Sequence, residues 1–280
     1  MLFYLRKQEV LRLRNMQAVH LAIGNFDGIH LGHRALLKQA VENAHARRQT
    51  VAVLTFHPHP KRVLRLPNAP QLIYPIHHRC YLLRKSDCDA VCVQPFDEAF
   101  AALTPEAFFD HLLRQFPTLV AVYVGEDYRF GSRCAGNTHT LEELCRRHGI
   151  ELHVCPNLKD NGEKISSTRI RKALREGSID VANRLLGAPY HCIGWVQKHP
   201  NEGCSSLTKA TDHTEDGSET LFFHTHNELK PKDGFYCCTL RNKYGQQTVH
   251  VRLENGRIRF LSSIQPILRR GGMLSFEKNL

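Results

Sequence analysis

A glycine-rich segment near the start of the chain carries two histidines, in the order Gly24-Asn25-Phe26-Asp27-Gly28-Ile29-His30-Leu31-Gly32-His33. Side chains three residues apart share one face of a helix, so His30 and His33 would point the same way where a helix begins. Two imidazoles that donate to one phosphoryl group would stabilise the negative charge of a transition state. The alternative is a strand-to-helix turn with two incidental histidines. We favour a phosphate site, to which the backbone of Gly24, Asn25, Phe26, Asp27 and Gly28 contributes.

Alternating apolar strands and amphipathic helices must hold this segment in place, from about residue 18 to residue 187. Strands are predicted at Val19–Ile23, Thr50–Phe56, Ala90–Val93, Leu119–Val124 and Glu151–Cys155, and helices over Leu36–Ala44, Arg79–Lys85, Pro105–Phe116 and Leu141–His148, with two short helices from about Thr168 and Ile179. This order predicts a parallel sheet flanked by helices, with right-handed crossovers. The histidine segment follows the first strand, at the sheet edge where ligands bind.

The pattern changes after Gly187, where short strands replace the alternation of strand and helix. Strands are predicted at His191–Gln197, Thr220–His224, Phe235–Leu240, Thr248–Leu253 and Arg257–Leu261. Asn255-Gly256 is the signal of a type I′ hairpin turn, and residues 199–217 are polar enough for an exposed loop. We therefore expect two domains, an α/β domain over residues 1–187 and a small antiparallel β module over residues 188–280.

The composition is that of a globular protein, because 42 % of the 280 residues are hydrophobic and 23 % are charged. No apolar run approaches the ~20 residues of a membrane-spanning helix, and the first residues lack the pattern of a signal peptide, so we expect a cytoplasmic protein. The formal net charge of +11 is spread along the chain, which favours a polyanionic small substrate over a nucleic acid. The ten cysteines include no Cys-x-x-Cys pair and are expected to be reduced thiols.

His30-Leu31-Gly32-His33 after a first strand is the signature of the nucleotidylyltransferase superfamily, and the longer string from Gly24 resembles the adenylyltransferase module of bacterial FAD synthetase. That module is usually fused to a riboflavin kinase module. Further segments resemble motifs of the same family in the same order, namely TFHPHP at Thr55–Pro60, FDEAF at Phe96–Phe100, GEDYRFG at Gly125–Gly131 and ISSTRIR at Ile165–Arg171. The resemblance covers about residues 18–190. It implies a Rossmann-like nucleotidylyltransferase domain followed by a small antiparallel β-barrel-like module.

A second phosphate cradle is predicted where Ser166, Ser167 and Thr168 precede a helical stretch. Arg171 lies one turn inside that helix and would add a bidentate donor. Arg169 and Arg171 are two residues apart and cannot share a helix face, and the family motif favours Arg171 as the inward residue. We expect Arg171 to share a cleft with His30 and His33.

The remaining candidate residues follow two other strands. Asp127 and Arg129 come after the strongest strand, at its carboxyl end, where polar residues tend to bind nucleotides. The strand exit at Pro58, His59 and Pro60 is a candidate wall for the flavin, and Phe130 either borders this aromatic ligand or belongs to the core. A simple strand terminator explains the two prolines equally well.

The resemblance implies adenylyl transfer, in which the phosphate of FMN attacks the α-phosphorus of ATP to give FAD and pyrophosphate. The attacking phosphate is already an anion at neutral pH, so catalysis rests on positioning and on neutralising charge. His30 and His33 would serve the α-phosphate, and Ser167, Thr168 and Arg171 the leaving pyrophosphate. Mg²⁺ is expected between phosphate oxygens, and we name no protein ligand for it because Mg²⁺ often uses few.

The second module departs from the kinase pattern of the family. That pattern includes a Pro-Thr-Ala-Asn motif whose Thr and Asn serve Mg-ATP. We place the equivalent stretch at Gly203–Ala210, with Leu207 in place of Pro and Ala210 in place of Asn, and Ala188 replaces the Arg of the LGRPY segment. Pro231–Tyr236 does resemble a strand of the family. We therefore expect a degenerate, shortened kinase module that no longer phosphorylates riboflavin.

Three alternatives stay open. The chain is a bifunctional riboflavin kinase/FAD synthetase, or it is a catalytically quiet protein that binds flavin or nucleotide, against which the intact histidine pair argues. The third alternative, adenylation of a nicotinate or pantetheine derivative, is disfavoured by the Gly24–Gly28 string. His57 and Asn137 stand where the family often has acidic residues, which leaves the flavin affinity open. The oligomeric state is also open.

Overall fold

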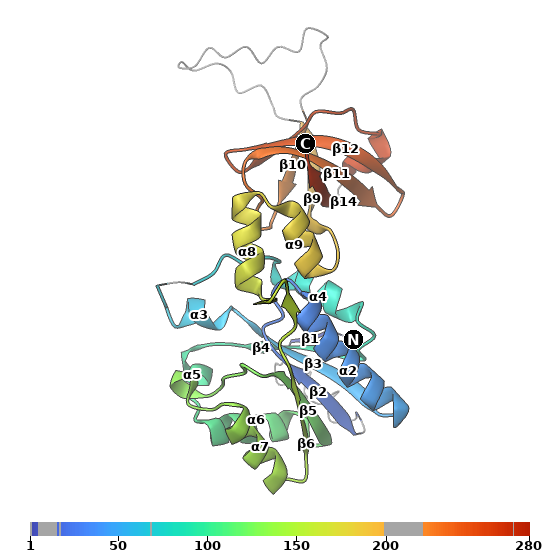
Figure 1. Cartoon of the computed structure of the whole chain (residues 1–280). Helices are drawn as coiled ribbons and strands as arrows, with labels where there is room; N and C mark the ends of the chain where they lie inside the picture. The colour runs from blue at the N-terminus through green and yellow to red at the C-terminus, as the bar shows by residue number, and fades with distance from the viewer. Residues whose placement is uncertain (1, 5–15, 17, 68, 199–220, 271) are drawn as a thin grey trace. The chain divides into compact units, whose positions relative to one another are not determined.

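The computed structural model describes residues 2–4, 16, 18–67, 69–198, 221–270 and 272–280. The chain forms two compact units, the first made of Met1–Leu72 and Ile76–Ser167 and the second of Ile73–Pro75 and Thr168–Leu280. Figure 1 shows the helices and strands of both. The chain therefore passes from one unit to the other more than once along its length.

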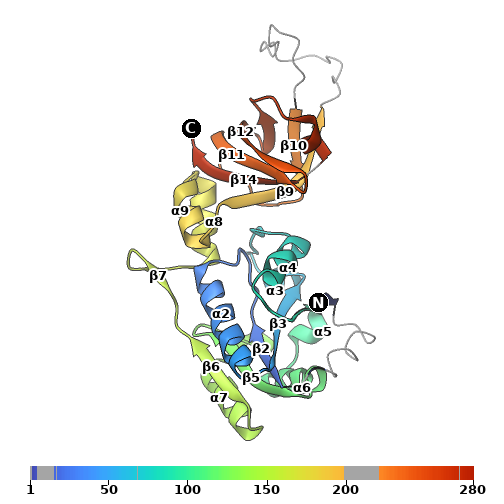
Figure 2. The same ribbon diagram turned by 90° about the vertical axis from the view of Figure 1, so that its right-hand side faces the viewer.

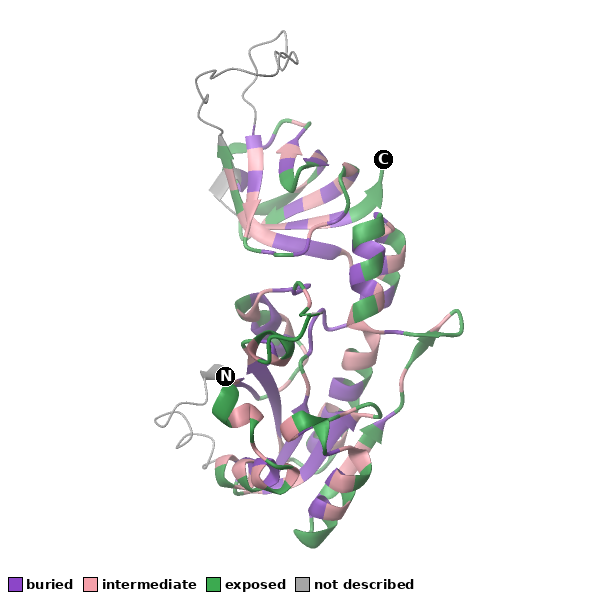
Figure 3. Ribbon diagram, turned by 90° about the vertical axis from the view of Figure 1, so that its left-hand side faces the viewer, coloured by how far each residue is buried: buried purple, intermediate pink, exposed green. Residues whose placement is uncertain are grey.

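Six parallel strands form the sheet of the first unit, in the order β1-β4-β3-β2-β5-β6. Their bounds are β1 Leu2–Tyr4, β2 Val19–Ile23, β3 Thr50–His57, β4 Ala90–Pro95, β5 Leu119–Gly125 and β6 Glu151–Cys155. The central strands are buried along almost their whole length, as parallel strands covered on both faces must be (Figure 3). The predicted parallel sheet is confirmed.

Helices cover both faces of this sheet (Figures 1 and 2). The helices of this unit are α2 Leu31–Ala46, α3 Pro60–Val63, α4 Ile76–Arg84, α5 Glu98–Ala101, α6 Pro105–Gln115 and α7 Thr138–Arg147. The unit also contains the short 3-10 helix η1 Ser132–Cys134 and a separate two-stranded sheet of β7 Lys159–Asp160 and β8 Glu163–Lys164. Successive side chains of a strand face opposite ways. Leu21 therefore packs in one apolar cluster with residues of α6 and α7, and Ala22 in another with residues of α2 and α4.

The second unit contains two helices, α8 Ser167–Glu176 and α9 Ile179–Leu186, followed by a closed antiparallel barrel. Ser167, the first residue of α8, belongs to the first unit. The barrel order is β10-β13-β12-β11-β14-β9. Its strands are β9 Tyr190–Lys198, β10 Leu221–Thr225, β11 Gly234–Asn242, β12 Gly245–Glu254, β13 Arg257–Phe260 and β14 Gly272–Asn279, with the 3-10 helix η2 Pro266–Arg270 before the last. Tyr236, Cys238 and Leu240 alternate along β11 as buried core residues, which confirms the predicted antiparallel β module.

Two features of the second unit bear on the sequence predictions. Asn255 and Gly256 have φ values of 49° and 71°, as a type I′ turn between β12 and β13 requires. The strand β14 was not predicted, and it closes the barrel between β9 and β11. The predicted loop over residues 199–217 and the Gly203–Ala210 stretch lie outside the described residues.

Candidate active site

The turn between β2 and α2 has a strained backbone. Phe26 and Ile29 have φ values of 49° and 46°, in the left-handed region that side chains other than glycine rarely adopt, and Gly28 has a φ of 86°. Such strain persists only where the surrounding structure enforces it, and it clusters at ligand sites. The turn lies at the carboxyl edge of β2, which pairs with β3 on one side and β5 on the other. The predicted position of a ligand site at this edge agrees with this geometry.

His30 and His33 lie against each other at the start of α2. Their ring centroids are 3.7 Å apart and their planes differ by 16°. His30 is the N-cap residue of the helix, and its Nδ1 accepts a hydrogen bond of 3.3 Å from the backbone N–H of His33. The edge of the Phe26 ring packs on His33, with 5.2 Å between ring centroids. The two histidines therefore lie together on one side of the helix start.

Burial lowers the pKa of His33 well below its ordinary value, and the nearby His30 and the cationic Arg79 lower it further. Desolvation and like charge both oppose the imidazolium form. His33 is consequently neutral at neutral pH. Its Nδ1 is buried and has no hydrogen-bond partner within the part of the chain that the structure describes.

Two side chains bind a carbonyl of the turn: Arg79, which sequence analysis did not single out, and Thr55, which it named only within the TFHPHP segment. Arg79 of α4 donates from Nη1 to the carbonyl oxygen of Asn25 at 2.6 Å and from Nη2 to that of Phe56 at 2.9 Å. Thr55 of β3 donates its hydroxyl to the same Asn25 oxygen at 3.2 Å. Arg79 was counted only as part of a predicted helix, because an arginine in a helix usually faces solvent.

Ser167 is the other support of the turn, and sequence analysis did predict it as a site residue. Its hydroxyl donates to the carbonyl oxygen of Asp27 at 2.8 Å. Asp27 itself is only 1 % exposed. This hydrogen bond joins Ser167, the first residue of α8, to the turn between β2 and α2. Because it reaches a backbone carbonyl oxygen, Ser167 stabilises the turn here.

Backbone N–H groups of the turn are available for a ligand. Within the described residues, no hydrogen bond is made by the N–H of Asn25, Phe26 or Gly28. The N–H and C=O of a trans peptide point in opposite directions, and the peptides of this turn are trans. Holding the carbonyls of Asn25 and Asp27 toward protein donors therefore directs the N–H groups of Phe26 and Gly28 the other way, as in anion-binding turns.

The residues assigned to the flavin lie in different surroundings. His59 is buried and caps α3, where its Nδ1 accepts from the N–H of Lys61 at 3.2 Å. Pro58, which follows a cis peptide bond, is exposed, and Pro60 opens α3. Phe130 is buried between Phe108 and Tyr128, in the same apolar cluster as the end of β3. Contact of these residues with a flavin stays a prediction.

Asp127 and Arg129 follow β5 as predicted, and both are exposed. Asp127 accepts a hydrogen bond of 3.0 Å from Asn157 and is paired with Lys164. These contacts join the loop after β5 to the segment that precedes α8. No described contact brings either residue to the turn after β2, so their role in nucleotide binding stays a prediction.

The remaining candidates lie around the start of α8. Ser166 is half-buried and Thr168 exposed, and Arg171 is buried with 8 % of its surface accessible. Arg171 and Thr168 belong to the second compact unit, whereas Ser166 and Ser167 belong to the first. The expectation that Arg171 shares a cleft with the histidine pair stays a prediction.

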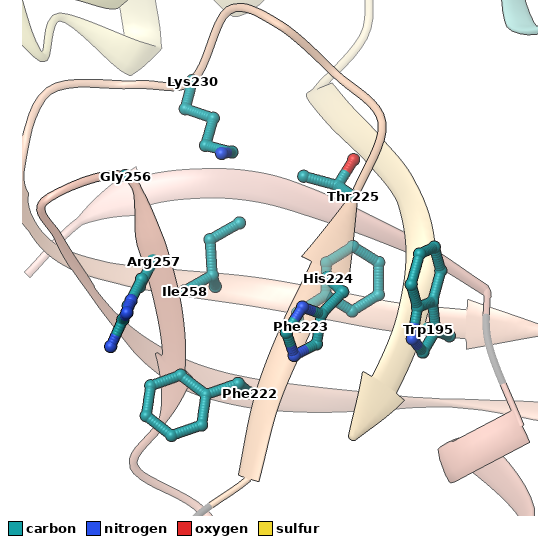
Figure 4. Close-up of a pocket in the computed structure, with 9 residues that line it drawn as sticks. All are labelled: Trp195, Phe222, Phe223, His224, Thr225, Lys230, Gly256, Arg257 and Ile258. Carbon is teal, nitrogen blue, oxygen red and sulfur yellow. The ribbon is translucent and has the colours of Figure 1, made fainter. Parts of the chain in front are cut away.

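The second unit has a cavity of about 300 Å³ beside β10. Its lining residues, drawn in Figure 4, are Trp195, Phe222, Phe223, His224, Thr225, Lys230, Gly256, Arg257 and Ile258. Trp195 stacks on His224 with 5.8 Å between ring centroids. The lining offers aromatic rings and two cations, and none of these residues carries a carboxylate.

A Thr-x-Asn sequence lies at the end of β10, where the structure describes it. Thr225-His226-Asn227 keeps the Thr and Asn spacing of the family's Pro-Thr-Ala-Asn motif, with His224 at the position of Pro. Thr225 donates its hydroxyl to the carbonyl of Ile193 at 2.8 Å. Our placement of the motif at Gly203–Ala210 lies outside the described residues and stays a prediction.

The amide of Asn227 is buried and occupied by protein partners. It lies 3.4 Å from the carbonyl of Ile73, 3.2 Å from the hydroxyl of Tyr190 and 3.2 Å from the carbonyl of His191, and only 3 % of the residue is exposed. An amide engaged in this way holds chain segments together.

No cluster of three or more histidine, cysteine or carboxylate side chains in the described ranges is arranged to hold a metal ion. Mg²⁺ requires fewer protein ligands when it arrives on phosphate oxygens. None of the described helices combines the length and the hydropathy needed to cross a bilayer.

Fold and site together define a Rossmann-like α/β domain with a strained turn and a histidine pair after its β2 strand, followed by a β-barrel module. The family model described as FAD synthetase matches residues 13–169. The chain is 31 % identical over 233 residues to the bifunctional riboflavin kinase/FMN adenylyltransferase of Haemophilus influenzae, over 83 % of this chain and 72 % of that protein. The chain belongs to the FAD synthetase family, as predicted.

Other relatives match over the first part of the chain. The bifunctional riboflavin kinase/FMN adenylyltransferase of Escherichia coli is 34 % identical over 176 residues, which are 63 % of this chain and 56 % of that protein. The Bacillus subtilis protein of the same name is 35 % identical over 178 residues, 63 % of this chain and 55 % of that protein. This chain therefore aligns with little more than half the length of these two relatives.

A solved structure is similar over nearly the whole chain. It is described as a macrolide-efflux protein from Streptococcus pneumoniae, and it has a TM-score of 0.77 and 25 % sequence identity. The similarity covers 95 % of this chain and 94 % of that chain. A chain of comparable extent with both an α/β and a β-barrel part is thus known in another protein.

Proposed function

We propose that this protein transfers AMP from ATP to FMN and releases FAD and pyrophosphate. An oxygen of the FMN phosphate bonds to the α-phosphorus of ATP, and the bond from that phosphorus to the pyrophosphate oxygen breaks. The observation that carries this proposal is the stacked pair of His30 and His33 beside the N–H groups of Phe26 and Gly28. The membership of this chain in the FAD synthetase family, together with the names of its relatives, supports the choice of FMN and ATP as substrates.

The chain's own residues act by positioning and by charge. The second pKa of a phosphate monoester is about 6, so FMN attacks as an anion and no base has to remove a proton. His30 and His33 would donate N–H groups to the α-phosphate, and backbone N–H groups would hold its neighbours. Mg²⁺, when bound through the nucleotide, supplies neutralising charge on the phosphates. Arg171 would take the leaving pyrophosphate, a role that the family motif suggests.

The test is direct formation of FAD. Purified protein is incubated with FMN and Mg-ATP, and FAD and pyrophosphate are quantified together. Equimolar appearance of both is expected. Binding of FMN and ATP without turnover would overturn the proposal in favour of a quiet flavin-nucleotide binder. Turnover with a nicotinate or pantetheine phosphate in place of FMN would assign another substrate.

We further propose that the protein does not phosphorylate riboflavin. In the second unit, the Thr225 hydroxyl and the Asn227 amide are bonded to protein atoms, and the described lining of the nearby cavity contains no carboxylate. Phosphoryl transfer depends on side chains that hold Mg²⁺ and accept the hydroxyl proton. Incubation with riboflavin and Mg-ATP is expected to yield no FMN. Accumulation of FMN would make the protein bifunctional.

A further inference from the structure

Arg79 is the largest side chain that the described structure buries completely. It lies in the middle of α4, between the buried His78 and Cys80, with no exposed surface. A charge in the protein interior costs several kcal/mol unless hydrogen bonds and an opposite charge offset the loss of hydration. A buried arginine in this helix therefore calls for a reason beyond the packing of the core.

The contacts of Arg79 all lie at the edge of the sheet where the candidate site is. Its two terminal nitrogens reach the carbonyls of Asn25, in the turn after β2, and Phe56, near the end of β3. One rigid guanidinium thereby joins the phosphate turn to the exit of the neighbouring strand. Burial lowers the pKa of Arg79, and the carboxylate of Asp27, the opposite charge near it, offsets only part of this effect.

The guanidinium is not fully satisfied by these contacts. Its Nε is buried and has no hydrogen-bond partner among the described residues. A buried donor without a partner costs about 1–3 kcal/mol, so a purely stabilising role is a poor explanation for an arginine here. The two terminal nitrogens each bind a carbonyl at the site, whereas Nε has no described partner. This pattern indicates that the guanidinium serves to orient those carbonyls.

The geometry acts on the peptide between Asn25 and Phe26. Arg79 and Thr55 both bind the Asn25 oxygen, so this carbonyl is held in one direction by two donors. The N–H of Phe26 belongs to the same trans peptide and points the opposite way. Without Arg79, only the Thr55 hydroxyl of these two donors would hold the carbonyl, and the direction of the Phe26 N–H would be less firmly fixed.

The charge of Arg79 acts on the histidine pair. The groups that face His33 electrostatically are His30, at the start of its own helix, and Arg79, from α4, and both oppose its protonation. Asp27, from the turn, faces Arg79. The pKa of His57, near the end of β3, is likewise lowered by burial and then by Arg79. Burial is the main cause of both lowered pKa values, and the charge of Arg79 adds to it at both imidazoles.

We propose that Arg79 is a positioning residue for adenylyl transfer, which fixes the Asn25–Phe26 peptide for phosphate binding. This inference rests on the proposed function and adds to it a residue that lies outside the recognised motifs. Arg79 does not itself touch the substrate. It acts through the peptide that it binds.

The experiment compares Arg79→Met and Arg79→Lys with Arg84→Met, which makes the same change at an exposed position of the same helix. Arg79→Met is expected to lower kcat by about 100-fold, the loss typical of a small misplacement in a site. It should also raise the midpoint of the His33 imidazole titration followed by NMR. Arg79→Lys retains the cation but loses the two-pronged hydrogen bonding of the guanidinium. It should lower kcat and leave the midpoint of the His33 titration near its original value. Arg84→Met should change neither.

The outcomes separate the two proposals. If the unaltered protein makes no FAD, the proposed function fails, and the His33 titration still decides whether Arg79 controls the ring. If FAD forms and a folded Arg79→Met protein keeps its kcat and its His33 midpoint, the inference about Arg79 is wrong. Should Arg79→Met not fold, Arg79→Lys decides, since a kcat equal to that of the unaltered protein would overturn the positioning role.

Discussion

His30 and His33 are coupled in two ways, through ring stacking at 3.7 Å and through a hydrogen bond from the backbone of His33 to Nδ1 of His30. Because Nδ1 of His30 accepts a hydrogen bond, the neutral ring carries its proton on Nε2. The cap of α2 therefore determines which nitrogen of His30 donates. One side chain ends the strained turn, begins the helix and presents a fixed N–H.

This dual role predicts that stability and catalysis can be separated at His30. His30→Ala should lose the cap, at about 1 kcal/mol of unfolding free energy, and should lose the imidazole as well. His30→Asn should retain the cap, because Asn is among the best N-cap residues, and should lose only the donor. We expect both variants to lower kcat by about 10²–10³-fold. Urea denaturation and FAD formation measure the two effects, and an active His30→Asn protein would contradict the assignment.

Gly32→Ala tests how closely the His30 ring must be held. A Cβ at Gly32 would lie 3.2 Å from Nδ1 and Cε1 of His30, so the ring would have to move by a few tenths of an ångström. Alanine favours a helix over glycine by about 1 kcal/mol. We expect a protein of equal or higher stability with about tenfold lower kcat. Gly125→Ala is the control, because a Cβ there meets nothing within 4 Å. Equal activity in the two variants would show that the stack tolerates displacement.

The pH dependence of folding follows from four buried or half-buried histidines. The pKa values of His20, His33, His57 and His111 are all lowered, in each case first by burial. Below the ordinary histidine pKa of about 6.5, the unfolded chain takes up protons that the folded chain refuses. The free energy of unfolding should therefore fall as pH falls through about 6.5, by at most about 1.4 kcal/mol per pH unit for each histidine.

The measurement is urea denaturation between about pH 7.5 and pH 5, above the range where carboxylates titrate. His20→Gln should flatten the pH dependence, because His20 is completely buried and bonded to Tyr123 and Gln49. A stability that is constant over this range, or that rises as pH falls, would contradict the lowered values.

Asn227→Ala should destabilise the barrel unit without touching the histidine site. The change leaves the buried Tyr190 hydroxyl and the His191 carbonyl without this partner, at a cost of about 1–3 kcal/mol. Thermal unfolding followed by a probe in the barrel, such as Trp195 fluorescence, should shift to lower temperature. Gln246→Ala, at an exposed position of β12, is the control. An unchanged unfolding temperature in Asn227→Ala would show that the buried amide does not stabilise the barrel unit.

The sequence sufficed where local periodicity decides the structure. β2 and β6 have the predicted bounds, because the apolar runs coincide with the strands. The strand β14 was missed because only Leu274 and Phe276 are apolar and buried in it, and its partners β9 and β11 are distant in sequence. Arg79 was missed for the same reason, since its burial depends on carbonyls more than twenty residues away along the chain.

The site was predicted in part. The side-by-side placement of His30 and His33 follows from their spacing, but His30 as a helix cap does not, because histidine is an uncommon cap. The role of Ser167 in holding Asp27 depends on the return of a distant segment, which no local pattern encodes.

The three residues Ile73–Pro75 belong to the barrel unit, although the chain before and after them belongs to the α/β unit. Tyr74 stacks on Tyr190 at 5.7 Å, and Asn227 binds the carbonyl of Ile73. Deleting the barrel at any single cut would leave Ile73 and Tyr74 as apolar groups without cover in the middle of the α/β sequence. Even without a kinase activity, the barrel would therefore be retained, because the Ile73–Pro75 loop depends on it for its packing.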